Sequence, residues 1–485
     1  MKSPTTLCGL LLASALVHAA NPQESDYYKI TTFPTPPETA LEVSSIELLP
    51  GGKLALGTRR GEIWTVSNAH GAADKIEYQL FAAGQHEVMG LAWKDGSLYE
   101  TNRYEVARLK DDDGDGRADT FATVSDKWGV SGDYHEYAFG SRFDKNGDIW
   151  VVLCLTGSFS SATDFRGWAM RVKPDGTLVP TCSGIRSPAG LGFDADGEVY
   201  YTDNQGPWHG ASTLQHLIPG TFQGHPGGFQ WYDKAPNMGP RPPAPNDNSR
   251  MVTERARIKE LVPPAVYMVH GKIGNSSSFI VCDLSKGKFG PFQKQLFVAD
   301  QCHSNISRVF LESVNGVKQG VVFPFLKGFK SGPIGGRMND DGQIFVGGSD
   351  RGWGAQGGKP FNFERVDWTG KVPFEVHEMR AKPDGFELTF TEPVDPATAG
   401  DPASYKAREF TYIYRGDYGS PEVDDVIPKI TKAVVGGDRK SVRLTFDKLT
   451  KGHIHELHFD GVKSASGTPI LHPVGYYTLN EIPTQ

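Results

Sequence analysis

The segment with the clearest chemical signature is a run of aspartates in which carboxylates alternate along the chain. Gly116 stands at its sixth position, where an EF-hand-type loop makes its sharp turn, while Ala122 replaces the usual bidentate glutamate. Calcium prefers oxygen ligands, so this spacing predicts a structural calcium site, with a solvated acidic turn as the alternative. The predicted ligands are Asp111, Asp113, Asp115, Arg117 through its carbonyl oxygen, and Asp119.

Two residues further along the chain have side chains suited to catalysis. His135 precedes an apolar strand-like run, and a histidine can act as a general base because its pKa lies near neutral pH. Arg186 lies in a loop before another such run, and its guanidinium can stabilise an oxyanion, a quinone oxygen or a carboxylate. The alternatives are structural: His135 as a packing residue, and Arg186 as an ion-pair partner that ties two parts of the fold together.

A larger set of polar and aromatic residues lies in loops beside other strand-like runs and is predicted to line a binding pocket. Trp208 stands near side chains that form hydrogen bonds, which suits a sugar with apolar ring faces and hydroxyl groups; packing of the indole is the alternative. The predicted binding residues are Gln85, His86, Glu87, Tyr134, Asp203, Asn204, Gln205, Trp208, His209, His225, Lys272, His303, Arg337 and Arg351.

The elements that must position these side chains recur along the chain. Each copy has an apolar strand, in most cases a turn with Asp or Asn and Gly, a second apolar strand and a further strand with a polar end. The copies begin at Leu48, Leu91, Ser141, Leu191, Phe289 and Arg337. Most turn glycines are spaced at the roughly 40–50 residue period of propeller repeats. We therefore predict an all-β fold with a six-bladed β-propeller; a solenoid is the structural alternative.

The pattern also divides the chain. Residues 20–370 are assigned to the propeller, with an insertion at about 220–274. Residues 371–485 contain several short strand-like runs, which predict a small Ig-like β-sandwich. Residues 1–19 combine Lys2, a short apolar core and small residues, which is typical of a secretory signal peptide. We expect a secreted or periplasmic protein with no integral membrane segment.

Composition limits the classes of partner. The 57 glycines and 33 prolines fit many tight turns between short strands. The formal net charge is −7 and no basic block is present, so no nucleic-acid partner is expected. Four cysteines follow the signal peptide, and an exported protein can pair them, with buried free thiols as the alternative. They are Cys154, Cys182, Cys282 and Cys302.

The loop and strands around Arg186 also carry a family-like signature. The motif Gly184-Ile185-Arg186-Ser187-Pro188, followed by a strand, an Asp-Gly turn and Tyr201-Thr202-Asp203-Asn204, resembles that of the glucose/sorbosone dehydrogenase family. Characterised members of that family are six-bladed propellers that use pyrroloquinoline quinone (PQQ) and calcium. The resemblance implies that His135 is the catalytic histidine. Ser187 is a departure, because the family has Asn at this position.

Nearly the whole mature chain is similar to a subgroup of that family, the large secreted proteins of planctomycete and verrucomicrobial bacteria. The segments that carry this likeness are Asp203–Gly206, Gly287–Phe292, Asp350–Gly354 and Tyr418–Glu422. The likeness favours an exported oxidoreductase that acts on a sugar or polyol and passes its electrons to a separate acceptor.

Three functions remain open for a small-molecule or oligosaccharide ligand. In a dehydrogenase, His135 takes a hydroxyl proton, hydride passes to a quinone, and calcium polarises the cofactor. In a carbohydrate-active lyase or hydrolase, His135 or Tyr134 acts as acid or base and Arg186 neutralises a negative charge. In a non-catalytic propeller, the same loops bind a glycan.

Overall fold

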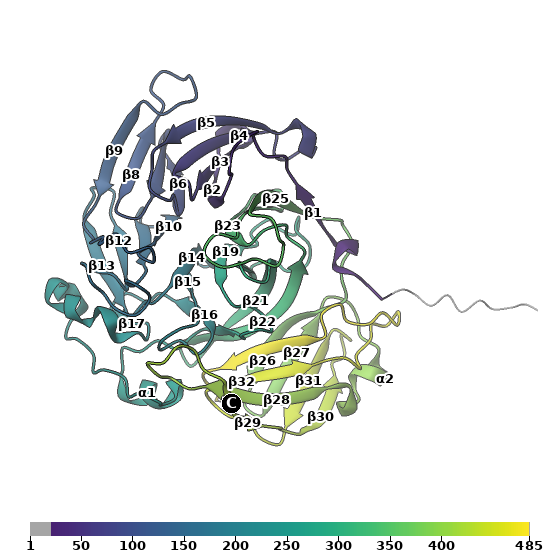
Figure 1. The fold of residues 1–485 in the computed structure, drawn as a ribbon. Coiled ribbons are helices and arrows are strands. Elements are labelled where there is room, and N and C mark those ends of the chain that lie inside the picture. Colours follow the sequence, from purple (N-terminus) through teal and green to yellow (C-terminus); the bar gives the residue numbers. More distant parts are fainter. Residues whose placement is uncertain (1–20, 485) are drawn as a thin grey trace, which may run out of the picture.

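The computed structural model describes residues 21–484, so the predicted signal peptide at 1–19 lies outside the described residues. Their regular structure is almost entirely β-sheet, with only short helices. The prediction of a mostly β protein is therefore confirmed. Six sheets surround a common axis, and at one side a C-terminal unit combines a seventh sheet with an extension of one sheet of the ring (Figure 1).

The first three sheets of the ring follow one another along the chain. The first contains β2 (Val43–Leu49), β3 (Lys53–Thr58), β4 (Glu62–Ser67) and β5 (Glu77–Ala83). The second contains β6 (Gly90–Lys94), β7 (Ser97–Thr101), β8 (Val106–Lys110) and β9 (Thr120–Ser125). The third contains β10 (Ala138–Phe143), β11 (Ile149–Leu153), β12 (Trp168–Val172), β13 (Leu178–Ser183) and the short parallel β17 (Thr221–Phe222).

The remaining three sheets complete the ring. The fourth contains β14 (Pro188–Phe193), β15 (Val199–Asp203), β16 (Ser212–His216) and β18 (Val266–Met268). The fifth begins with β19 (Ser277–Cys282), β20 (Leu296–Asp300), β21 (Asn305–Val314) and β22 (Val317–Lys327). The sixth contains β23 (Pro333–Met338), β24 (Gln343–Ser349), β25 (Phe361–Trp368) and, from the other end of the chain, β1 (Tyr28–Thr32).

One strand of each sheet lies beside the axis, and these inner strands close the ring. They are β2, β6, β10, β14, β19 and β23, and β2 contacts both β6 and β23. The closure is reinforced by β1, which pairs with β25 from Tyr28 opposite Trp368 to Thr32 opposite Glu364. The repeat pattern, whose first copy begins at Leu48, did not reveal β1.

Turn glycines and burial explain why these strands form where they do. Gly147 and Gly197 adopt φ values of 81° and 79° in the hairpins after two inner strands, a left-handed conformation that glycine adopts without steric cost. The strand that follows Gly147, β11, is buried along its whole length. Its continuous apolar run is therefore typical of a strand whose sheet is covered on both faces by the neighbouring sheets of the ring.

The predicted insertion lies within the fourth sheet. Between β16 and β18 the chain forms β17, the short 3-10 helices η4 (Pro226–Lys234) and η5 (Pro236–Met238), and α1 (Met251–Arg257). The expected range of 220–274 is too long at its end, because β18 is the outermost strand of the fourth sheet. Further short 3-10 helices are η1 (Glu24–Asp26), η2 (Pro50–Gly52) and η3 (Ala73–Lys75).

The C-terminal unit contains two packed sheets. One consists of β26 (Val376–Lys382), β27 (Gly385–Phe390), β31 (Ser441–Phe446) and β30 (Ile430–Val435). The other consists of β33 (Val474–Leu479), β32 (His453–His458), β28 (Lys406–Tyr412) and β29 (Glu422–Val426). The short helices α2 (Pro396–Ala399) and η6 (Pro402–Ser404) connect β27 to β28.

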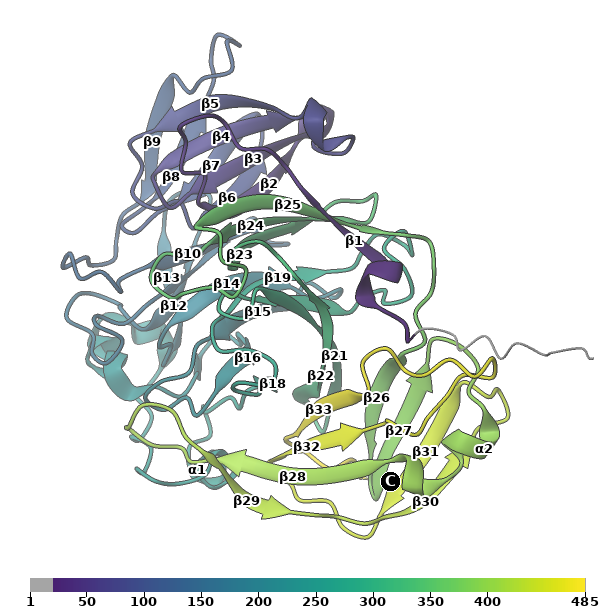
Figure 2. The ribbon, with the colours of Figure 1, turned by 45° about the vertical axis from the view of Figure 1, so that its right-hand side comes forward.

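This unit is continuous with the ring. β33 pairs with β22 from Thr478 opposite Gly320 to Tyr476 opposite Val322, so eight strands form one sheet across the two parts (Figure 2). Phe323 of the ring belongs to the same hydrophobic cluster as Phe386 of the C-terminal unit. The two parts therefore share a sheet and a core.

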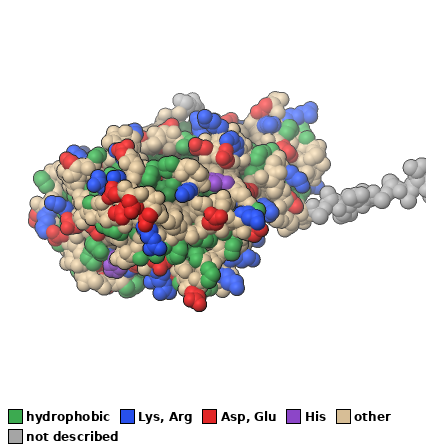
Figure 3. All heavy atoms as spheres, turned by 90° about the horizontal axis from the view of Figure 1, so that it is seen from above, with side chains coloured by type: hydrophobic (Ala, Val, Ile, Leu, Met, Phe, Trp, Pro, Cys, Tyr) green, Lys and Arg blue, Asp and Glu red, His purple; other side chains and the backbone are tan. Residues whose placement is uncertain are grey.

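No helix of the described residues is long and apolar enough to cross a membrane. Within the same residues the four cysteines are free thiols; Cys154 and Cys182 are buried, and Cys282 and Cys302 are partly exposed. Acidic and basic side chains are interspersed over the face seen in Figure 3.

Candidate functional site

A cavity of about 50 Å³ lies on the ring axis, at the end where the inner strands begin. His135 and Ser187 line it from the loops that lead into β10 and β14. Arg59, Asn204 and Gln301 line it from the positions directly after β3, β15 and β20, and the half-exposed Trp353 lines it from the loop after β24. The inner strands all run in the same direction along the axis, so the loops at their starting ends lie at the same end of the ring. Residues from several sheets therefore meet at this cavity.

His135 is buried and held by two hydrogen bonds. Its Nδ1 lies 2.8 Å from the carbonyl oxygen of Leu155, and its Nε2 lies 3.0 Å from Ser187 Oγ. Burial and, to a smaller extent, the positive charge of Arg186 lower the pKa of His135 to about 4, although the hydrogen bond to the Leu155 carbonyl opposes the shift. At neutral pH the ring is therefore uncharged. Because a carbonyl only accepts, Nδ1 carries the proton and Nε2 is the acceptor.

Asp203 fixes the loop that carries Ser187. Its Oδ1 accepts a hydrogen bond from the backbone N–H of Ser187 at 2.7 Å, and its Oδ2 accepts one from Arg186 N–H at 2.9 Å. Asp203 is fully buried and does not line the cavity. In this structure Asp203 positions the loop, and its predicted contact with a ligand stays a prediction.

A network of ion pairs surrounds the cavity. Glu87 Oε2 lies 2.6 Å from Arg103 Nε, and Glu87 Oε1 lies 3.3 Å from Arg59 Nη2. Arg351 Nη2 lies 2.6 Å from Glu42 Oε2, and its carbonyl accepts a hydrogen bond from Arg59. Glu87 and Arg351, predicted as binding residues, therefore tie loops of neighbouring sheets together.

The hydrogen bonds of Arg186 also stabilise the fold rather than the cavity. Its guanidinium donates hydrogen bonds to the carbonyl oxygens of Ser158, Asn204 and Gln205, the last at 2.6 Å. The side chain is buried and does not line the cavity. The structure thus supports the scaffold role that the sequence left open, with backbone carbonyls in place of an acidic partner.

The predicted cluster after β15 packs against the C-terminal part of the chain. The backbone N–H of Trp208 donates to the carbonyl of Arg415, and its indole lies edge-on to Tyr414, with 5.1 Å between the ring centroids. His209 and His225 are buried outside the cavity, and burial lowers the pKa of both. These residues therefore lie apart from the axial cavity, and Trp208 packs against Tyr414; their role in sugar binding stays a prediction.

Other predicted binding residues are dispersed. Gln205 donates to the carbonyl of Gly210, and Lys272 Nζ lies 2.8 Å from Glu456 Oε2 in the C-terminal unit. Several others do not line the cavity: Gln85, His86, Tyr134 and His303. Arg337 lies at the opposite end of the axis, beside a second cavity. Among the predicted catalytic and binding residues, only His135 and Asn204 line the cavity.

The aspartate loop connects β8 and β9, the two outer strands of the second sheet. One carboxylate oxygen each of Asp111, Asp113 and Asp115 lies within 4.8 Å of the others. Asp111 accepts hydrogen bonds from the N–H groups of Gly114 and Gly116, which shape the turn. None of the predicted ligands, Arg117 and Asp119 included, lines the axial cavity, so an ion here would be structural.

Several lining residues are not among those predicted from the sequence; they include Arg59, Tyr137, Ser276, Gln301 and Trp353. For two of these residues, the position within the repeat was a usable signal. Arg59 and Gln301 directly follow the second strand of a repeat, as Asn204 does. An alignment of the repeat copies by their second strands would have brought these three residues to one position.

Comparison with known families gives one assignment. Residues 58–320 match the model of a family described as a domain of unknown function, DUF7133. The chain belongs to this family. The DUF7133 segment covers most of the ring and includes His135, Ser187, Asn204 and Gln301. No curated protein matches the chain.

Solved structures similar to this DUF7133 protein include sugar dehydrogenases. The PQQ-bound aldose sugar dehydrogenase of Streptomyces coelicolor is 14% identical over 72% of this chain and 100% of its own, with a TM-score of 0.49. The PQQ domain of pyranose dehydrogenase from Coprinopsis cinerea, in holo form, is 13% identical over 72% and 99%, with a TM-score of 0.46. At such identities and scores, neither cofactor nor activity carries over to this chain.

Proposed function

We propose that this chain is an exported sugar or polyol dehydrogenase-like oxidoreductase in which His135 is the general base. The observation that carries the proposal is an uncharged imidazole whose Nε2 lies at an axial cavity lined by hydroxyl and amide side chains. Among the described residues, no aspartate or glutamate lines this cavity, which argues against a glycosidase with two catalytic carboxylates.

The proposed proton transfer follows from the hydrogen bonds of His135. Nδ1–H is held by the Leu155 carbonyl, so Nε2 keeps its lone pair directed at the Ser187 hydroxyl. A substrate hydroxyl that takes the place of the Ser187 hydroxyl donates its proton to Nε2. The low pKa of His135, about 4, keeps the base unprotonated at neutral pH.

The cavity offers two unused polar atoms to a cofactor. Arg59 Nε and Asn204 Oδ1 are buried and have no hydrogen-bond partner within residues 21–484. A volume of about 50 Å³ is too small to enclose PQQ, so only a polar edge of it would reach these two atoms, as donor and acceptor, and the half-exposed Trp353 could cover a flat ring. A quinone of this class supplies a two-electron acceptor for hydride from the carbinol carbon. Arg351 and Arg103 are already paired with glutamates and offer no free guanidinium to its carboxylates.

The same proposal includes the finer points of architecture and location. We infer that the ring is a six-bladed β-propeller and the C-terminal unit an Ig-like sandwich, and that residues 1–19 direct export. The partners are a small-molecule or oligosaccharide substrate and a separate electron acceptor. Calcium binds in this proposal to the aspartate loop at the ring edge, where it stabilises the fold.

The test is a turnover assay on the chain without residues 1–19. The protein is incubated with Ca²⁺ and PQQ, and reduction of a dye is followed over a panel of aldoses, polyols and oligosaccharides. Quinone-dependent dye reduction that is lost in His135→Gln supports the proposal. Failure of the wild-type protein to bind the quinone or to reduce the dye overturns it.

A second candidate rests on the His135–Ser187 contact itself. A nucleophile, a base within hydrogen-bond distance and a third group that orients the base form the general arrangement of a serine hydrolase. Ser187 Oγ would attack the carbonyl of a carbohydrate ester while Nε2 takes its proton. Nε2 then returns the proton to the departing sugar hydroxyl, and water releases the acid and restores Ser187.

One substitution separates the two candidates. Ser187→Ala removes the nucleophile of a hydrolase and leaves the base of a dehydrogenase in place. Loss of ester cleavage together with an absence of dye reduction would assign the hydrolase. Binding of oligosaccharides without any turnover would leave the third possibility, a glycan-binding propeller.

A further inference from the structure

The axis holds a second, larger cavity at the end where the inner strands finish. Its volume is about 220 Å³, and it is lined by the later residues of the inner strands, whereas the earlier residues line the cavity at His135. Met89, Phe139, Ala189 and Ile334 line both cavities and form an apolar belt between them. Leu284, which is 55% exposed, lies at its solvent side.

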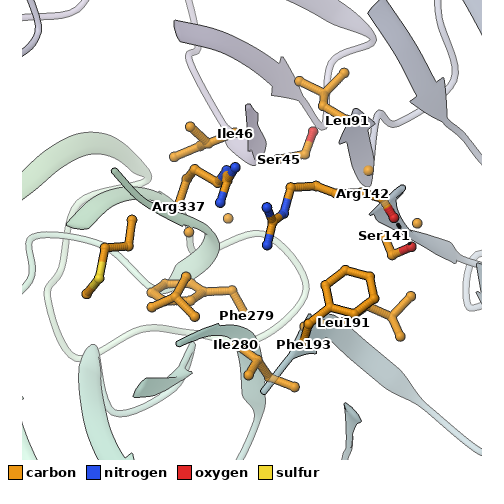
Figure 4. A pocket seen from close by; sticks show the side chains of 18 of the residues that line it. Ser45, Ile46, Leu91, Ser141, Arg142, Leu191, Phe193, Phe279, Ile280 and Arg337 are labelled. Carbon is orange, nitrogen blue, oxygen red and sulfur yellow. Dashed lines mark hydrogen bonds between the residues drawn. The ribbon is translucent and has the colours of Figure 1, made fainter. Parts of the chain in front are cut away.

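Two arginines face each other inside this cavity. Arg142 comes from β10 and Arg337 from β23, and their guanidinium groups point toward one another (Figure 4). Arg337 Nη2 lies 3.2 Å from Glu47 Oε1, but its Nε is buried without a partner. Within residues 21–484, Arg142 has neither an ion-pair partner nor a side-chain hydrogen bond.

A β-bulge directs Arg142 into the cavity. The register of β10 against β11 shifts between Gly140 and Phe143, which places one extra residue on the inner strand. In the neighbouring β14 the irregularity falls earlier, between Pro188 and Gly190. Bulges re-aim side chains, and Arg142 lies within this one with its guanidinium in the cavity, although the residue as a whole stays exposed to solvent.

Few carboxylates are free to pair with the two arginines. Desolvation of the guanidinium and the charge of Arg337 together lower the pKa of Arg142 to about 10, although the residue as a whole is exposed to solvent, so Arg142 stays charged at neutral pH. Glu47 supplies one carboxylate for the two guanidinium groups. Asp194 also borders the cavity, but it accepts the turn N–H groups of Asp196 and Glu198 and lies 3.6 Å from Lys318 Nζ. Asp340 at the border is exposed.

Apolar side chains form part of the walls around the arginines, beside serine and asparagine side chains. Ile46, Leu91, Leu191, Phe193, Phe279 and Ile280 line the cavity, and the Arg142 guanidinium carbon lies 5.7 Å from the centre of the Phe193 ring. An apolar cavity of about 150 Å³ is known to hold benzene, so 220 Å³ suffices for one ring with a small substituent. A guanidinium group binds a carboxylate through two parallel hydrogen bonds.

We propose that the cavity between Arg142 and Arg337 binds a small organic carboxylate with an apolar body. The carboxylate bridges the two guanidinium groups, and its body fills the space between the phenylalanine and aliphatic side chains. The site is separated from His135 by the apolar belt, so it does not depend on the function proposed for the other end of the axis.

The probe is benzoate, and its binding to the full mature chain is measured by isothermal titration calorimetry. Benzyl alcohol has the same body without the charge, while acetate and inorganic phosphate have charge without the apolar body. We expect benzoate to bind at least about tenfold more tightly than each of these three, because each of them lacks either the charge or the apolar body. Tenfold in the dissociation constant corresponds to about 1.4 kcal/mol.

The matched variants are Arg142→Gln and Arg439→Gln. Arg142 has no partner to lose, so its replacement leaves the melting temperature unchanged or raises it, while benzoate binding falls at least about tenfold. Arg439 is exposed on the hairpin between β30 and β31, and its replacement leaves binding unchanged. Arg337→Gln is a second variant that weakens benzoate binding.

Three results would overturn the proposal. They are no benzoate binding to the wild-type protein, undiminished binding by Arg142→Gln, and binding of phosphate or acetate as tight as that of benzoate. The last result would mean that the arginines bind small anions without selecting for an apolar body.

Discussion

Ser187 Oγ lies 3.0 Å from His135 Nε2, although 52 positions separate the two residues in the chain. The contact exists because β10 and β14 are neighbouring inner strands whose preceding loops meet at the axis. In the proposed oxidation, the substrate hydroxyl must displace the Ser187 hydroxyl from His135. In the alternative hydrolysis, the Ser187 hydroxyl is the nucleophile that attacks the substrate.

Replacement of His135 is expected to lower activity in both mechanisms, whereas replacement of Ser187 is expected to abolish only a hydrolysis. For oxidation, His135→Gln lowers kcat by about 10²–10⁴-fold, the typical contribution of a general base, while Ser187→Ala changes it by less than about threefold. Stopped-flow dye reduction measures both, and unchanged melting temperatures show that the fold is intact. A Ser187→Ala variant as inactive as His135→Gln would contradict the oxidation.

The activity should depend on pH through His135. Its pKa in the folded protein is about 4, so Nε2 is free above this pH and protonated below it. We expect kcat/KM to be flat from about pH 6 to 8 and to fall tenfold per unit below pH 4. A profile that falls already at pH 6.5 would mean that His135 is solvated or is not the base.

The lowered pKa of His135 also makes the free energy of unfolding depend on pH. The pKa of His135 is depressed relative to 6.5 in the unfolded chain, so the unfolded state binds more protons between pH 6.5 and 4. The free energy of unfolding should therefore decrease as the pH falls through this window. Urea titrations of wild type and His135→Gln at pH 7.0, 5.5 and 4.5 measure the effect, which the variant should lack.

His472 should produce the opposite dependence at high pH. It lies 2.5 Å from Glu375 Oε1 and 3.0 Å from Glu24 Oε1, and although burial opposes the charge, these two carboxylates raise its pKa to about 9. Its stabilising effect is complete below pH 6.5 and is lost as the pH rises through 9, by at most about 3 kcal/mol.

Urea midpoints of wild type and His472→Gln at pH 6, 8 and 9.5 measure this contribution. The wild type should lose stability over the range, and the variant should be less stable at pH 6 and nearly flat. His458→Gln is the matched control, since His458 pairs with Glu456 at a half-exposed position. Equal slopes for His472→Gln and wild type would contradict the assignment.

The aspartate loop should bind calcium without taking part in turnover. Millimolar Ca²⁺ is expected to raise the melting temperature by a few degrees, since an ion that binds only the folded state stabilises it. Asp113→Asn should abolish the increase, and Asp126→Asn, at an exposed aspartate on the next loop, should not. A rise of equal size in Asp113→Asn would place the ion elsewhere.

The ring should require the C-terminal unit. Removal of residues 371–485 would leave the edge of β22 unpaired and expose the apolar side chains of Val321 and Phe323. We expect the shortened chain to aggregate, whereas the chain that ends at residue 485 stays soluble. A monodisperse, cooperatively unfolding fragment 21–370 in size-exclusion chromatography and thermal melts would contradict this expectation.

Local patterns in the sequence determined much of this protein. Apolar runs and Asp-Gly or Asn-Gly turns predict the inner and second strands, because strand burial and left-handed turns depend on a few neighbouring residues. They also place His135 in a loop before an inner strand, and the aspartates on one turn. Each of these features spans only a short stretch of chain.

Only the tertiary structure decided which side chains meet. The repeat pattern places Arg337 at the start of the sixth copy, but β23 begins at Pro333, and Gly335 and Gly336 interrupt the apolar pattern of this strand. Arg337 therefore lies at the far end of the axis, opposite Arg142, and not beside His135. Ser187 reaches His135, and β33 reaches β22, through contacts between distant segments, which no local pattern of residues encodes.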